Sequence, residues 1–143
     1  MKIKRLNDLA KMPTKGSKYA AGYDLYAATS YEITIEPHRT VMIDTGLAME
    51  VTDGWFGAIF PRSGIAAKRG LRLANSVAVI DSDYRGSVMI ALHNDTNYTQ
   101  AVAPGERIAQ IVFLPFGAPD FEEVDELDET ERGAGGFGST GKV

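Results

Sequence analysis

The stretch Asn75-Ser-Val-Ala-Val-Ile-Asp-Ser-Asp-Tyr-Arg-Gly86 combines a strand with a group of polar side chains. An apolar run, Val77–Ile80, predicts a buried strand and leads directly into Asp81, Asp83 and Tyr84. Because unpaired buried charge is costly, such a strand must hold its terminal carboxylates at a surface or in a cleft. A carboxylate fixed at a strand end is suited to act as a general base for water. An Asp-Ser-Asp cluster is also typical of a solvated β-turn, and this stretch alone leaves both interpretations open.

Strand patterns recur about every ten residues on both sides of this stretch. Tyr31–Glu36 and Val88–Leu92 alternate apolar with polar residues, as half-buried strands do. Arg107–Leu114 is apolar almost throughout, which predicts a strand buried on both faces. Its one polar residue, Gln110, is either a hydrogen-bonded core residue or a contact in a pocket. No long amphipathic helical pattern is present, so the sequence predicts an all-β fold.

The amino-terminal third is less regular. Within the first twenty residues, the polar segment Lys11–Lys18 is interrupted by Pro13 and Gly16, which predicts an irregular connector. Strand-like alternation follows around Asp24. Further along, Leu47–Val51 and Trp55–Phe60 flank the turn sequence Thr-Asp-Gly, which predicts a β-hairpin.

One segment, Pro61–Gly70, departs from the strand pattern. Its Ala-Ala-Lys-Arg run favours a helix of about two turns, with Ser63 as the amino-terminal cap and Gly70 as the carboxyl-terminal cap. Backbone N–H groups at the helix start, beside Arg62, Ser63 and Gly64, would suit a phosphate group. The alternative is an ordinary capped surface helix with solvated basic side chains.

The carboxyl-terminal part is acidic and then rich in glycine. We expect a domain spanning residues 1–131 and a flexible arm spanning residues 132–143. Gly133–Gly138 has the glycine spacing of a dinucleotide-binding loop and of a P-loop. It opens no predicted helix, and Ser139 stands where a P-loop needs lysine, so both are rejected. A frayed terminus and an arm that closes over a ligand remain the two interpretations.

Composition narrows the classes of function. A chain of 143 residues is long enough for one domain with a real core, and its net charge of −4 argues against general binding to nucleic acid. Four basic residues nevertheless fall within residues 62–72, which suits a small polyanion. The absence of cysteine excludes disulfides and favours a cytoplasmic setting. No apolar run approaches membrane-spanning length, and the two histidines lack metal-ligand spacing.

Five segments, taken in order, resemble the motifs of the trimeric dUTP pyrophosphatase (dUTPase) family. The resemblance extends from about Tyr19 to Gly141, and one departure is Ala78, where the family generally has glycine. The five segments are Ala21–Leu25, Pro61–Gly64, Val79–Gly86, Gly105–Gln110 and Arg132–Gly141.

The resemblance implies a fold and a reaction. The fold would be a jelly-roll-like distorted β-barrel with one short helix, assembled as a homotrimer whose active sites are shared between subunits. The reaction would be Mg²⁺-dependent hydrolysis of dUTP to dUMP and pyrophosphate, which keeps uracil out of DNA and supplies dUMP for thymidylate synthesis. No membrane or nucleic-acid partner is implied.

The resemblance also implies residue roles. Asp81 would be the general base, Tyr84 would pack under the deoxyribose, and Asp24 would reach the metal ion through water only. The residues implied for substrate binding are Arg62, Ser63, Gly64, Asn75, Val79, Ile80, Asp81, Tyr84, Met89, Gln110, Arg132, Phe137, Gly138, Ser139 and Thr140.

Three other functions compete with this one. A dCTP deaminase-like enzyme shares the fold, but normally lacks a glycine-rich tail. A dUTP-sensing regulatory trimer would bind the nucleotide and signal through partner proteins. A purely structural β-sandwich would need none of the five motifs.

Overall fold

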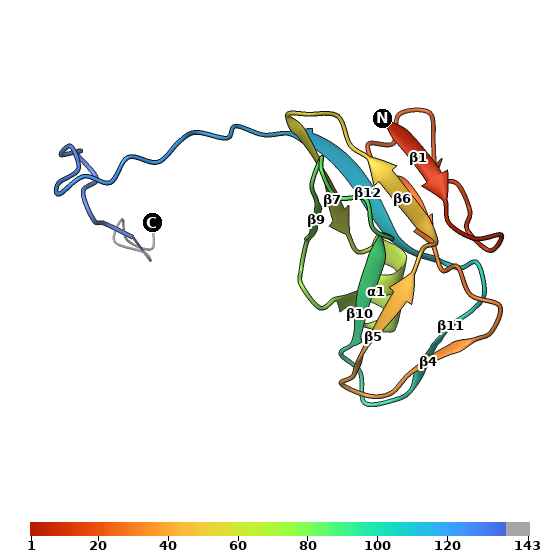
Figure 1. Ribbon diagram of the computed structural model, residues 1–143. Coiled ribbons are helices and arrows are strands. Elements are labelled where there is room, and N and C mark those ends of the chain that lie inside the picture. The colour runs from red at the N-terminus through yellow and green to blue at the C-terminus, as the bar shows by residue number, and fades with distance from the viewer. Residues whose placement is uncertain (137–143) are drawn as a thin grey trace.

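A computed structural model describes residues 1–136. It contains one helix, α1 (Ser63–Arg69), and short strands throughout the first 115 residues (Figure 1). The strands are β1 (Lys2–Arg5), β2 (Thr14–Lys15), β3 (Tyr23–Tyr26), β4 (Ile33–Ile35), β5 (Thr40–Asp44), β6 (Leu47–Glu50), β7 (Trp55–Phe60), β8 (Leu71–Leu73), β9 (Ala78–Ile80), β10 (Met89–Asn94), β11 (Gln100–Val102) and β12 (Arg107–Pro115).

The strands pair antiparallel, mostly with partners that are distant in sequence. The largest sheet has the order β2-β3-β12-β7-β9, and a second has the order β5-β10-β8. Two-stranded pairs, β1-β6 and β4-β11, complete the set. The predicted all-β class with a single short helix is therefore confirmed.

Alternating strand residues form the core. On β10 and just before it, Val88, Ile90 and Leu92 are fully buried, as their spacing predicts. Ile108 and Ile111 of β12 are buried in the same way. The carboxyl-terminal end of β12 emerges from the core, because Leu114 is 38% exposed. The prediction of burial on both faces thus holds for the middle of β12 and not for its end.

Two predictions about local structure are wrong. Residues 52–54 do form a turn, with the amide of Trp55 donating to the Thr52 carbonyl over 3.0 Å. The strands on either side do not form a hairpin, because β6 pairs with β1 and β7 pairs with β12 and β9. The predicted connector, residues 11–18, is not wholly irregular, because Thr14–Lys15 forms the short strand β2 along β3.

Strand β9 was predicted to be a buried strand, but only one of its faces is buried. It lies at the edge of the five-stranded sheet and pairs only with β7 in the described residues. Ile80 is buried, whereas Val79 is 57% exposed. The apolar run before Asp81 therefore presents one face to the core and the other to solvent.

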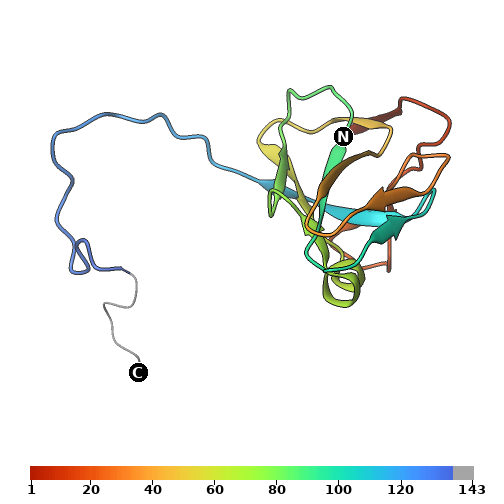
Figure 2. The ribbon, with the colours of Figure 1, turned by 90° about the horizontal axis from the view of Figure 1, so that it is seen from below.

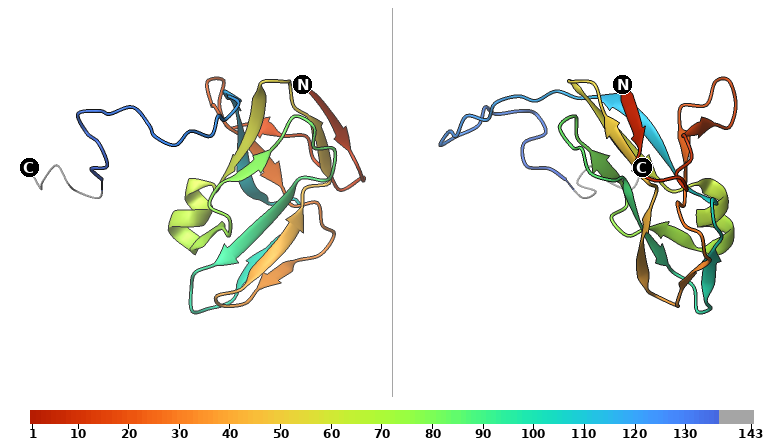
Figure 3. Two further views of the ribbon diagram at one scale, coloured as in Figure 1. Left: turned by 60° about the vertical axis from the view of Figure 1, so that its left-hand side comes forward. Right: turned by 45° about the vertical axis from the view of Figure 1, so that its right-hand side comes forward.

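Helix α1 packs on the outside of the strands (Figure 3). Its amino-terminal cap is Arg62 with no side-chain capping bond, so the prediction that Ser63 caps the helix is wrong. Gly70 ends the helix with a φ of 62°, as predicted. Arg69 fixes the helix end to β11 through a hydrogen bond to the carbonyl of Ala101, and to the loop before β12 through an ion pair with Glu106.

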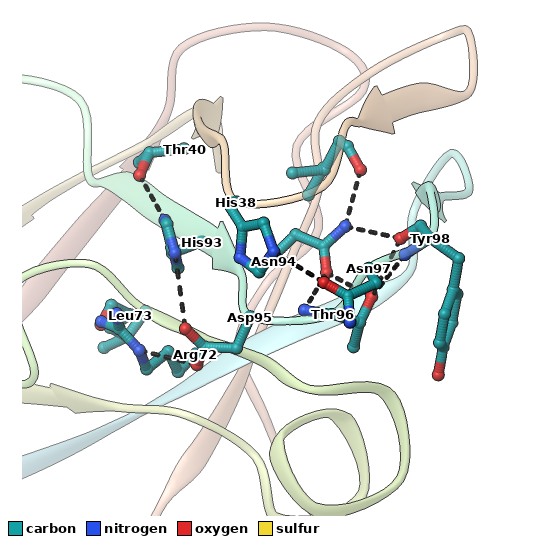
Figure 4. Close-up of polar contacts among 11 residues, drawn as sticks. His38, Thr40, Arg72, Leu73, His93, Asn94, Asp95, Thr96, Asn97 and Tyr98 are labelled. Atoms are coloured by element: carbon teal, nitrogen blue, oxygen red, sulfur yellow. Dashed lines mark hydrogen bonds and ion pairs between the residues drawn. The ribbon is translucent and has the colours of Figure 1, made fainter.

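A polar cluster lies where β10 ends (Figure 4). Asn94 is fully buried, and its Nδ2 donates to the carbonyls of Ile35 and Tyr98 over 3.0 and 2.9 Å. Both histidines belong to the cluster. His38 Nε2 lies 2.9 Å from Asn97 Oδ1, and the ring of His93 lies between a threonine and an aspartate side chain.

The chain after β12 leaves the strands. Residues 116–136 run away from the rest of the molecule without helix or strand (Figures 1 and 2). They carry exposed apolar side chains among acidic ones, including Phe121, which is 98% exposed. No helix within residues 1–136 is long and apolar enough to cross a membrane.

Candidate functional site

A cleft of about 230 Å³ lies beside the edge strand β9. Six residues predicted for substrate binding or catalysis line it, although they come from separate parts of residues 75–89. Two lining residues, Ala78 and Ser87, were not predicted. The lining residues are Asn75, Ala78, Val79, Ile80, Asp81, Tyr84, Ser87 and Met89.

Asp81 stands on the turn that follows β9. The amide of Tyr84 donates to the Asp81 carbonyl over 3.2 Å, which closes the turn. The Asp81 side chain is exposed and lines the cleft. The two interpretations of this stretch are therefore compatible, because the turn is what holds the carboxylate at the cleft.

The departure at Ala78 does not disturb the backbone. The non-glycine residues with positive φ in residues 1–136 are His38 and Ser76, so Ala78 lies in a conformation that any residue adopts. Ala78 is half-buried, packs against the core and also lines the cleft.

A second polar group lies elsewhere on the large sheet and is called here the arginine cluster: Asp24, Arg62 and Arg107. Asp24 is 7% exposed. Its Oδ1 accepts from Arg62 Nε over 2.7 Å and its Oδ2 accepts from Arg107 over 3.1 Å. The role of Arg107 was not predicted; the available signal was a charged residue at the start of an apolar strand.

A bulge brings Arg107 to this cluster. Gln110 pairs with Asp24, and an unbroken ladder would place Arg107 opposite Ala27, on the other face of the sheet. The register shifts between Arg107 and Ala109, so that Arg107 pairs with Tyr26 instead. Since Tyr26 and Asp24 share a face of β3, the arginine reaches the carboxylate.

Gln110 lies next to the arginine cluster and is hydrogen-bonded, as its position in a strand had suggested. Its Nε2 donates to the Pro61 carbonyl over 3.1 Å. A Cβ on Gly22 would lie 2.5 Å from the Gln110 carboxamide oxygen, so a larger residue at position 22 would displace that carboxamide. Ser63 and Gly64 are exposed at the start of α1 and do not line the cleft.

The cleft and the arginine cluster are far apart within one chain. Asp24, Gln110 and Phe60 form one row across the sheet, while Asp81 follows Ile80, which pairs with Gly57. This places Asp81 roughly 13 Å along the strands from that row and three strands, or roughly 14 Å, across from Asp24. The phosphorus atoms of a triphosphate are linked by single oxygens and span only a few ångströms. One nucleotide therefore cannot contact both groups in the same chain.

The remaining predicted residues lie in the carboxyl-terminal segment. Arg132 belongs to the extended part of the chain, and its Nε donates to the Gly135 carbonyl over 2.8 Å. Phe137, Gly138, Ser139 and Thr140 lie outside the described residues.

The protein offers no metal cage of its own in residues 1–136. No group of three or more histidine, aspartate or glutamate side chains is placed there to hold an ion.

Comparison with known proteins gives a consistent result. The family model described as dUTPase matches residues 8–141. The deoxyuridine 5'-triphosphate nucleotidohydrolase of Desulfitobacterium hafniense (strain DSM 10664 / DCB-2) is 51% identical over 138 residues, which are 96% of this chain and 91% of that protein.

Two solved structures extend the comparison to the fold. The Staphylococcus bacteriophage 80alpha dUTPase with dUPNHPP has a TM-score of 0.90 at 30% identity, over 98% of this chain and 97% of that one. A mutant dUTPase from phage phi11 of S. aureus, described as coordinating a structural Mg(II) ion, has a TM-score of 0.79 at 25% identity, over 87% and 96% of the two chains.

Proposed function

The chain belongs to the dUTPase family, and from that premise we propose how its residues hydrolyse dUTP to dUMP and pyrophosphate. The observation that carries the proposal is the cleft beside β9, which gathers Asp81, Tyr84 and four other predicted residues around about 230 Å³. A cleft of this size with one exposed carboxylate at its rim suits a nucleoside better than a polymer.

Asp81 acts as the general base. Its carboxylate orients a water molecule toward the α-phosphorus and accepts a proton as the water oxygen bonds to phosphorus. The bond between the α-phosphorus and the α,β-bridging oxygen breaks, and pyrophosphate leaves. The turn that fixes Asp81 supports this role, because a base held by a rigid strand end needs no reorganisation.

The rest of the cleft selects the nucleoside. Asn75 and the backbone of Val79 and Ile80 hydrogen-bond the uracil edge, and Met89 lines the wall. The backbone of Val79 and Ile80 can do so because one edge of β9 pairs with no other strand in the described residues. Tyr84 packs under the deoxyribose and leaves no room for a 2′-hydroxyl. Polar groups left unpaired against a wrong base discriminate by about 10⁴-fold or more.

The phosphates are held by a neighbouring subunit. Arg62, Ser63, Gly64 and Gln110 bind them, and the separation of the arginine cluster from Asp81 in one chain supports a site at which two chains meet. Exposed apolar side chains in a second hollow, which shares Met89 with the cleft, include Met42 at 56% and Tyr31 at 69% exposed, and support such an interface. A homotrimer with three shared sites follows from the family.

The family and the phi11 relative support a divalent metal ion, and Mg²⁺ is the ion proposed here. The residues present fit an ion held mainly by phosphates and water, since Asp24 already accepts two arginine donors and can reach it only through water. When bound, the ion spreads the charge that develops on the leaving pyrophosphate.

Residues 132–143 close the site as an arm that follows a domain of residues 1–131. Arg132, Ser139 and Thr140 reach the phosphates, while Phe137 stacks on uracil beside Gly138. A glycine-rich arm can close over a ligand and exclude water. The proposed location of the enzyme is the cytoplasm, in keeping with the absence of cysteine.

Pyrophosphate release from dUTP, UTP, dTTP and dCTP tests the reaction. We expect release from dUTP alone, and a loss of at least about 10²-fold in Asp81→Asn. Asp83→Asn, in the same turn but not lining the cleft, is the matched control and keeps full activity. Ammonia release from dCTP would favour the deaminase, and dUTP binding without turnover would favour the regulatory trimer.

Mixed trimers test the shared site. Asp81→Asn and Arg62→Ala subunits, each inactive alone, are co-expressed and purified together. If each site takes its base and its arginine from different chains, some sites in the mixture are intact and activity returns. If activity stays absent in verified mixed trimers, the shared site is wrong.

A further inference from the structure

The side chain of Tyr84 is held by a residue that follows the Asp81–Tyr84 turn. Its hydroxyl donates to the Ser87 carbonyl over 3.0 Å. The ring folds back over Gly86, where a Cβ would lie 2.6 Å from Tyr84 Cζ. A larger residue at position 86 would displace the tyrosine ring, which lines the cleft.

The acceptor of that hydrogen bond is itself fixed to β5. Ser87 Oγ donates to Asp44 Oδ1, which also accepts from the amide of Gly46 over 2.7 Å. The next residue, Val88, is fixed as well, because its carbonyl accepts from Thr45 Oγ1 over 2.8 Å. A hydrogen bond to a carboxylate is stronger than one between neutral groups, so the Asp44–Ser87 link is the strongest side-chain contact of this segment.

We infer that Ser87 and Asp44 are positioning residues that fix the ring of Tyr84 and thereby set the preference for deoxyribose over ribose. The inference rests on the proposed function and deepens it. A ring can exclude a 2′-hydroxyl only if it cannot retreat. The Asp44–Ser87 link prevents that retreat because it holds the carbonyl to which the tyrosine hydroxyl is bound.

Ser87→Ala is the primary test. It removes only the part-buried Ser87 Oγ, leaves no large cavity and does not change the base Asp81. We expect the ratio of kcat/KM for dUTP to that for UTP to fall about ten-fold, which corresponds to the loss of one hydrogen bond. Ser87→Thr keeps the hydroxyl and is expected to retain most of the ratio.

Three further variants make the test specific. Asp44→Ala is expected to lower the ratio as Ser87→Ala does, and the double variant should match the single ones because both break the same link. Ser82→Ala, in the same turn, is the matched control. Its carbonyl, not its hydroxyl, accepts from Arg85, so the ratio should not change.

Binding of dUMP and UMP, measured by calorimetry, provides a readout that needs no turnover. Loss of the dUMP preference in Ser87→Ala, with Ser82→Ala unchanged, supports the inference. A ratio and a binding preference that are unchanged in folded Ser87→Ala overturn it, even if the enzyme hydrolyses dUTP normally. A wild-type protein that neither hydrolyses dUTP nor prefers dUMP overturns the proposed function instead.

Discussion

Replacement of Asp24 by asparagine removes the charge that holds the arginine cluster together. The carboxylate is 7% exposed and accepts from Arg62 over 2.7 Å and from Arg107 over 3.1 Å. Asparagine keeps the size of the side chain but presents an N–H₂ group to one of the two guanidinium groups. The variant therefore leaves two cations without their shared counter-ion.

The structure sets the size of the effect. The Arg62 side chain is 27% exposed, so its charged hydrogen bond contributes about 1.5–3 kcal/mol to stability. The Arg107 side chain is 50% exposed and contributes at most about 1 kcal/mol. The sum of about 2–4 kcal/mol corresponds to a fall in Tm on the order of 10 °C for a chain of this length.

Thermal unfolding at one fixed protein concentration measures this fall, and kcat/KM for dUTP measures the loss of phosphate binding by the displaced arginine. The control is Glu50→Gln, which breaks an ion pair with a similar 2.9 Å distance whose two side chains are 80% and 45% exposed. That variant should change neither quantity. If Asp24→Asn behaves like Glu50→Gln, or if Asp24→Asn and Arg62→Ala are additive in a double-mutant cycle, the cluster does not position Arg62.

Three further outcomes are expected. Asn94→Ala removes the side-chain donor to the buried Ile35 carbonyl of β4 and one of the two side-chain donors to the Tyr98 carbonyl, and should lower the free energy of unfolding by about 1–3 kcal/mol in a urea titration, with little change in kcat. A chain ending at Glu131 should keep the Tm of the full chain but lose at least about 10²-fold in turnover of dUTP, because the arm is missing; an unchanged turnover would remove the arm from the mechanism. The hydrogen bond from Lys2 and its charge lower the pKa of Glu50, so Lys2→Ala should raise that pKa toward its ordinary value in an NMR titration. The sign follows from the ion pair, whose contribution is present above the ordinary carboxyl pKa and is lost as the pH falls through the lowered one.

The fold class was predictable because strand periodicity is local. Val88, Ile90 and Leu92 predict a half-buried strand without reference to any partner, and all three are buried. The pairing of strands depends on partners that are distant in sequence. The turn at residues 52–54 has the sequence of a hairpin, but β7 gains more by lying between β12 and β9 in the core than by pairing with β6 at its side. Strand β1 has no apolar run and is recognisable only from its partner.

The cleft was predictable to a larger extent than the arginine cluster. Its residues fall between positions 75 and 89, so a strand followed by a turn already brings most of them together. The arginine cluster joins three separate parts of the chain. Asp24 lies on β3, Arg62 lies 38 positions later in the loop after β7, and Arg107 lies 83 positions later at the start of β12. Its third member depends on the bulge before Ala109, and nothing in the apolar run of β12 indicates where the register shifts.

The spatial separation of Arg62 and Asp81 could not be predicted from their positions in the sequence. Only one helix and two short strands, α1, β8 and β9, lie between them in the chain. The ladder separates them nonetheless, because Arg62 crosses toward β3 at one end of the sheet while β9 runs along the opposite edge toward the other end. Moving the two groups together in one chain would require breaking pairs in the centre of the sheet, whose residues Ala58, Ile59 and Ile111 are buried. Association with another copy costs no core contacts, so the register of β7 against β9 and β12 is itself a physical reason for the proposal that the active site is divided between chains.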